Sequence, residues 1–126
     1  DQWQVSSPFR TCAVVDERLL PVDVATVQGP TDLSDTTLGE RHLDTAFTGG
    51  AGGSWQIQLR CGDERRVLWA DEHFGWVQIY TPDDRSSLAV EPMTCGPDAF
   101  NEGPTHDSML RLDPGSGVEM RWGIHL

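Results

Sequence analysis

The chain has no lysine, no long apolar run and no paired cysteine spacing. All nine basic residues are arginines scattered over 126 residues, and 20 carboxylates bring the formal net charge to −11. Nucleic acids and anionic membrane surfaces would repel such a chain, so we expect neither as a partner. No segment approaches the roughly 18 apolar residues that span a bilayer as a helix.

Metal and disulfide patterns are also missing. An odd set of three cysteines without a CxxC spacing argues against a disulfide framework and a zinc site. We therefore expect free thiols in a reducing cytoplasm. The four histidines are far apart in the sequence and are expected in surface or loop positions: His42, His73, His106 and His125. Common nucleotide-binding, hydrolase and metalloprotease motifs do not occur.

Apolar and polar residues alternate along much of the chain, as in half-buried strands. The pattern predicts strands over residues 11–16, 19–24, 55–60, 65–70, 76–81, 88–91, 109–112 and 118–124. Pro92 is expected to end the strand at 88–91, and residues 48–53 read as a flexible glycine loop. Only residues 32–43 could hold a helical turn or two. The sequence thus predicts one all-β domain, a mainly antiparallel β-sandwich.

Three residue types are candidates for chemistry, each with a plainer interpretation. Glu91 ends an apolar strand, where a carboxylate either guards a sheet edge or acts as a partly desolvated base. Asp44 precedes the glycine loop and could simply cap a turn. Most of the five tryptophans belong in a core, but one could stack on the C–H face of a sugar, and Trp76 is the best placed.

Three stretches carry a family resemblance. Residues 76–81 (WVQIYT) are followed by 89–94 (AVEPMT), and 43–47 fit a Leu-Asp-x-x-Phe element. The order of residues from 69 to 101 closely resembles the C-terminal part of bacterial aldose 1-epimerases (mutarotases), of the galactose mutarotase-like superfamily. The resemblance implies that residues 1–126 are the C-terminal part of a single β-sandwich domain whose N-terminal half is absent from this chain.

The resemblance also implies a reaction, the interconversion of the α and β anomers of a free aldose. Glu91 corresponds to the base that deprotonates the anomeric hydroxyl, Asp44 to the aspartate that holds sugar hydroxyls, and Gln78 to a strand residue near the site. Trp76 is kept as a candidate sugar contact. No metal or cofactor is implied. The family's acid histidine, a second histidine and a sugar-binding arginine belong to the N-terminal half, and none of the four histidines matches them.

Two other functions stay open, a carbohydrate-binding or sensing module without catalysis and a purely structural sandwich. Part of a sandwich would expose strand edges and an apolar face. We therefore expect the N-terminal half or another chain to cover the open face. Gly96 stands where the family often has proline, which predicts a slightly looser loop.

Overall fold

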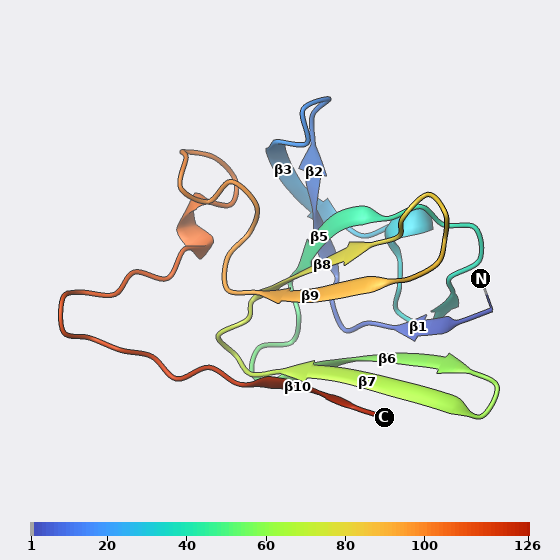
Figure 1. Ribbon diagram of the computed structural model, residues 1–126. Coiled ribbons are helices and arrows are strands. Elements are labelled where there is room, and N and C mark those ends of the chain that lie inside the picture. Colours follow the sequence, from blue (N-terminus) through green and yellow to red (C-terminus); the bar gives the residue numbers. More distant parts are fainter. Residues whose placement is uncertain (1) are drawn as a thin grey trace.

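The computed structural model describes residues 2–126, and these form two five-stranded antiparallel sheets (Figure 1). The first sheet has the order β10-β7-β6-β1-β4 and the second β3-β2-β5-β8-β9. Apolar residues of both sheets share one buried cluster. The expected all-β, antiparallel β-sandwich is therefore confirmed.

The strands are short and joined mostly by hairpins. The first sheet contains β1 (Gln4–Ser6), β4 (Thr36–Thr37), β6 (Trp55–Cys61), β7 (Glu64–Ala70) and β10 (Trp122–His125). The second contains β2 (Thr11–Val15), β3 (Pro21–Thr26), β5 (Asp44–Thr48), β8 (Trp76–Tyr80) and β9 (Ala89–Met93). Two 3-10 turns, η1 (Gly29–Thr31) and η2 (His106–Ser108), are the described helical elements. Neither is long or apolar enough to cross a membrane.

The β6–β7 hairpin confirms the clearest sequence pattern. Its ladder runs without interruption from the pair Trp55–Ala70 to the pair Cys61–Glu64. A two-residue turn closes it, and Gly62 takes φ = 57° there. Glycine adopts that left-handed conformation without the steric cost that a side chain brings.

Four sequence expectations about elements are wrong. β9 continues through Pro92 to Met93, because it lies at the edge of its sheet, where proline is tolerated. Residues 109–112 form no strand, and the strand predicted over 118–124 is reduced to β10. Residues 32–43 contain no helical turn and instead contribute β4.

The core is closed on one side by the long connection between β3 and β5. Leu33, Leu38 and Leu43 of this connection are 2%, 5% and 2% exposed, and they pack with Phe47 and Ile57. A spacing of five residues does not fit a helical face, but it suits an irregular segment that lays side chains into the sandwich at intervals.

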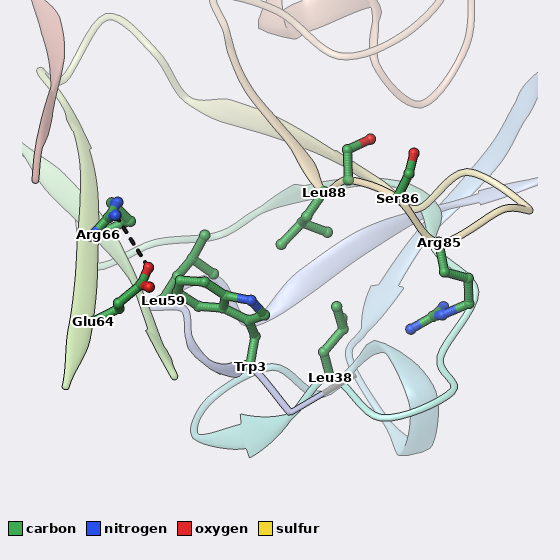
Figure 2. Close-up of a pocket in the computed structure, with 9 residues that line it drawn as sticks. Trp3, Leu38, Leu59, Glu64, Arg66, Arg85, Ser86 and Leu88 are labelled. Atoms are coloured by element: carbon green, nitrogen blue, oxygen red, sulfur yellow. Dashed lines mark hydrogen bonds and ion pairs between the residues drawn. The ribbon is translucent and has the colours of Figure 1, made fainter. Parts of the chain in front are cut away.

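The sandwich is open where β9 faces β7 and β10. Beside this opening, a hollow of about 360 Å³ lies between the N-terminal segment, the β6–β7 hairpin and the connection from β8 to β9. Apolar and polar side chains both line it, and Glu64 and Arg66 are paired there at 3.2 Å (Figure 2). The labelled apolar residues around it are Trp3, Leu38, Leu59 and Leu88. A neighbouring hollow of about 300 Å³ shares Leu59 and Leu88 and is lined further by Leu68, Val90, Ile124 and Leu126. Ile124 is 56% exposed, so apolar interior is left uncovered at this side.

Residues 109–121, which we call the arm, project away from both sheets before the chain returns as β10 (Figure 1). Asp71 fixes the end of the arm: its backbone N–H donates to the Arg121 carbonyl at 2.9 Å, and its carboxylate accepts the Arg121 backbone N–H at 2.5 Å. Burial by itself would raise the pKa of Asp71. Hydrogen bonds from the backbone N–H groups of Arg121 and His73 outweigh it and hold that pKa below its usual value.

Candidate functional site

The second sheet has two chemically different faces. Phe47, Val77 and Ile79 point into the buried cluster between the sheets. Because side chains alternate along a strand and paired residues point to the same side, Ala46 and its partner Gln78 lie on the opposite, outer face. The outer face is the side of this sheet turned away from the first sheet.

Three of the predicted site residues lie together on that outer face. Gln78 on β8 is paired with Glu91 on β9, and Asp44 is two residues before Ala46 on β5. The Gln78 Nε2 donates a hydrogen bond of 2.7 Å to the Asp44 Oδ1. Glu91 and Asp44 are exposed and Gln78 is half-buried. We call Asp44, Gln78 and Glu91 the polar row, which crosses three adjacent strands.

Trp76, the fourth predicted residue, shares this face but is covered. It is 5% exposed and packs with Ala13, Ala46 and Met93. A Cβ added at Gly96 would come within 2.7 Å of the Thr105 Cγ2 and 3.0 Å of the Trp76 Cε2. Glycine at 96 therefore lets the segment after β9 lie directly against Trp76, and the slightly looser loop that we expect there stays a prediction. In this position the Trp76 indole packs against Ala46 and Met93 and is covered from solvent.

A small hollow adjoins the polar row on its β2 side. It measures about 60 Å³ and is lined by Asp44 and Gln78 together with apolar residues from the β2–β3 hairpin and from the segment after β9. The lining residues that the sequence did not single out are Ala13, Val15, Leu19, Thr45, Ala46 and Pro97. Val15 and Leu19 of the hairpin and Pro97 of the 94–108 segment all line the hollow, so it lies between these two parts of the chain.

The tip of the β2–β3 hairpin carries an unusual leucine. Leu19 has φ = 60°, in the left-handed region that glycine and asparagine favour, and it is 60% exposed. A left-handed conformation costs a residue with a side chain roughly 1–2 kcal/mol. The sequence gives no direct signal for Leu19, because its left-handed conformation is visible only once the turn type is known.

The histidines are engaged away from the polar row, with one exception. The His73 Nδ1 lies 3.1 Å from the Asp71 Oδ1, and the His106 Nδ1 lies 2.9 Å from the Ala99 carbonyl oxygen. His125 stacks on Trp69 of the first sheet with ring centroids 6.3 Å apart. His42 is exposed in the segment that leads into β5.

Over residues 2–126, no group of three or more His, Cys, Asp or Glu side chains is arranged to hold a metal ion. The cysteines are unpaired: Cys12 is buried, whereas Cys61 and Cys95 are half-buried. The outer face thus offers carboxylates, an amide and apolar surface, the kinds of group that can recognise a small polar ligand.

Fold and site together define a class, an antiparallel β-sandwich with a hydrogen-bonded polar row on the outer face of one sheet. No family model matches the chain. It is 27% identical over 130 residues to a protein of Escherichia coli (strain K12) described as "Uncharacterized protein YihR". The match covers 99% of this chain and 41% of that relative, so the chain spans about two fifths of the relative's length. The relative's description states no activity.

Proposed function

We propose that the chain provides the base-bearing part of an aldose 1-epimerase site, with Glu91 as the base and Asp44 and Gln78 as ligands for sugar hydroxyls. The observation that carries the proposal is the polar row. Residues that are 34 and 13 positions apart in the sequence lie on adjacent strands, and Gln78 orients Asp44 by a 2.7 Å hydrogen bond. The family resemblance assigns roles to the same three side chains, to Asp44 through residues 43–47 and to Gln78 and Glu91 through residues 69–101.

In the proposed reaction, the Glu91 carboxylate takes the proton from the anomeric hydroxyl. An acid protonates the ring oxygen, the bond from that oxygen to the anomeric carbon breaks, and a C=O bond forms at the anomeric carbon. Rotation about the bond to the next carbon turns the other face of the aldehyde to the hydroxyl. Reclosure reverses both proton transfers, so atoms and charges balance. Asp44 and Gln78 would hold the other hydroxyls in place during the rotation.

The acid of this reaction is proposed to come from outside the described residues. His73, His106 and His125 are bound elsewhere, and the resemblance places the acid in an N-terminal half. The open side between β9 and β10 supports the idea of further strands, because the apolar surface there needs a cover. The free thiols are compatible with the proposed cytoplasmic location.

The proposal is tested by mutarotation of free aldoses, followed by polarimetry or NMR exchange on the longest natural polypeptide that contains this chain. Glu91→Gln should lower the rate by about 10²–10⁴-fold, the usual contribution of a positioned base. Glu119→Gln is the matched control, since Glu119 is an exposed glutamate on the arm that pairs with Arg121. A wild type that accelerates no aldose over buffer, or a Glu91→Gln variant of unchanged rate, overturns the proposal.

A second candidate function is sugar binding without catalysis. The observation that favours it is the composition of the polar row, which contains no histidine. This function predicts that aldoses perturb the NMR signals of Asp44 and Gln78 while mutarotation stays at the buffer rate. The same titration therefore separates the two candidates.

The proposed cover of the open side has its own test. Size-exclusion chromatography with mass spectrometry should find the 13.9 kDa chain associated with itself or poorly folded when produced alone. A well-folded, monodisperse monomer of that mass would contradict the proposed cover and would leave the polar row unaffected.

A further inference from the structure

Leu19 stands beside the polar row without contributing to the core. Its side chain is 60% exposed, and it lines the same small hollow as Asp44 and Gln78. Val15, at the start of the same turn, also lines this hollow and is 38% exposed. The hairpin thus places two uncovered apolar side chains next to a hydrogen-bonded carboxylate and amide.

The turn is built to hold Leu19 where it is. The Leu19 N–H donates to the Asp16 carbonyl at 3.0 Å, and the Asp16 carboxylate accepts the backbone N–H groups of Arg18 and Leu20 at 2.8 and 3.0 Å. The residue that follows such a turn is left-handed, a position where glycine is usual because it bears no strain. A leucine in this conformation lowers stability, and we take this cost as a reason to look for a function of its side chain.

The hollow is too small for a whole sugar. At about 60 Å³ it lies far below the 300–1,000 Å³ of sites that enclose a complete ligand, so it admits one edge of a ring or one substituent. One wall offers Asp44 and Gln78 for a hydroxyl, whereas the side chains of Leu19, Val15 and Pro97 offer only carbon. A sugar edge that contacts both walls would carry a hydroxyl on one carbon and only hydrogen or a methyl group on the next carbon.

We propose that Leu19 is a specificity-determining residue, which selects aldoses whose edge beside the hydroxyl held by Asp44 and Gln78 is apolar, the deoxy-aldoses. The inference rests on the proposed sugar site and deepens it. A hydroxyl turned toward Leu19 would lose its water without gaining a hydrogen-bond partner. A CH₂ or CH₃ group at that place would instead bury apolar surface.

The test compares each parent aldose with its 2-, 3- and 6-deoxy forms, by kcat/KM for mutarotation or by the dissociation constant from NMR titration. The variant is Leu19→Asn, because asparagine tolerates the left-handed conformation, has a similar size and is polar. Val22→Thr is the matched control: Val22 is 58% exposed on the same hairpin and does not line the hollow. Thermal unfolding of each variant checks that the hairpin is kept.

We expect the wild type to prefer at least one deoxy form over its parent. Leu19→Asn should lower that deoxy-to-parent ratio about 10-fold or more, the usual value of one methylene in an apolar pocket, and Val22→Thr should leave it unchanged. A wild type that acts on or binds aldoses, but whose ratio does not change in Leu19→Asn, overturns the role of Leu19 alone. A wild type that neither converts nor binds any aldose overturns both this inference and the proposed function.

Discussion

The two faces of the second sheet are built from neighbouring residues with opposite tasks. Phe47, Val77 and Ile79 are at most 1% exposed and hold the sandwich together. Their neighbours Ala46 and Gln78 look outward, into the region of the polar row. Because side chains alternate along a strand, neighbouring residues of β5 and β8 lie on opposite faces. One face stabilises the core, and the other carries the candidate ligand-binding groups.

The larger hollows of the molecule do not adjoin the polar row. The hollows of about 360 and 300 Å³ are larger than the hollow beside the polar row. The 300 Å³ hollow, between β9 and β10, is lined mainly by apolar side chains, whereas the 360 Å³ hollow mixes apolar residues with the Glu64–Arg66 pair. The smaller hollow includes a carboxylate bonded to an amide. The small hollow is therefore chosen for its hydrogen-bonded Asp44 and Gln78 and not for its volume, and the following substitutions test that choice.

The largest effect is expected on the inner face. Phe47→Ala should lower the free energy of unfolding by about 3–5 kcal/mol, because it leaves a cavity in the buried cluster. Glu91→Gln, on the outer face, should change stability by no more than about 0.5 kcal/mol. Urea unfolding measures both. A similar loss in the two variants would contradict the division of tasks between the faces.

Gly96→Ala should have the next largest effect, because the added methyl group would collide with Thr105 and Trp76. Overpacking of this kind costs roughly 1–3 kcal/mol. The control is Gly117→Ala, since nothing lies within 4 Å of a Cβ at Gly117. Equal stability of the two variants in urea would mean that the segment after β9 yields, and that Trp76 is not held as tightly as its contacts imply.

Gln78→Leu removes the hydrogen bond to Asp44 and should cost about 0.5–1.5 kcal/mol. The sugar signal in an NMR titration should weaken with it. Gln58→Leu is the control, because Gln58 is a half-buried glutamine of the first sheet that accepts a hydrogen bond from Arg65. Sugar binding that weakens equally in both variants would remove the special role of the polar row.

The smallest effect is expected at the base of the arm. The pKa of Asp71 is lowered from 3.8, so its contacts with Arg121 add stability above that pH and lose it as the pH falls through the lowered value. Protection of the Arg121 amide, taken as its exchange rate relative to the intrinsic rate at each pH, should therefore persist down to about pH 4 and fall below it. Asp71→Asn should remove this pH dependence of the protection. Protection that is already lost near neutral pH would contradict the assignment.

The sequence predicted the strands that carry strong alternation and clear turns, such as β6 and β7. It missed β1 and β4, which have three and two residues and exist only because partner strands hold them. It also missed that Asp44 begins a strand, since residues 44–48 do not alternate in polarity. Residues 109–112 are mostly apolar, but no strand among residues 2–126 pairs with them, and an apolar segment without a partner does not form a strand alone.

The site could be listed from the sequence but not assembled from it. Glu91, Gln78 and Asp44 were each singled out, but their adjacency depends on the pairing register of β5, β8 and β9, which long-range packing decides. The burial of Trp76 depends on Gly96 and Thr105, which lie far along the chain. Leu19 escaped notice because its strain comes from a turn conformation that the sequence does not state.

Pro92 has a consequence for the fate of newly made chains. β9 is an edge strand, and a proline has no N–H to offer to a further strand beside it. A row of amides that is interrupted in its middle is a poor template for stacking copies into fibrils. Pro92 therefore lowers the risk that newly made chains pair through β9 and polymerise before a partner covers that edge.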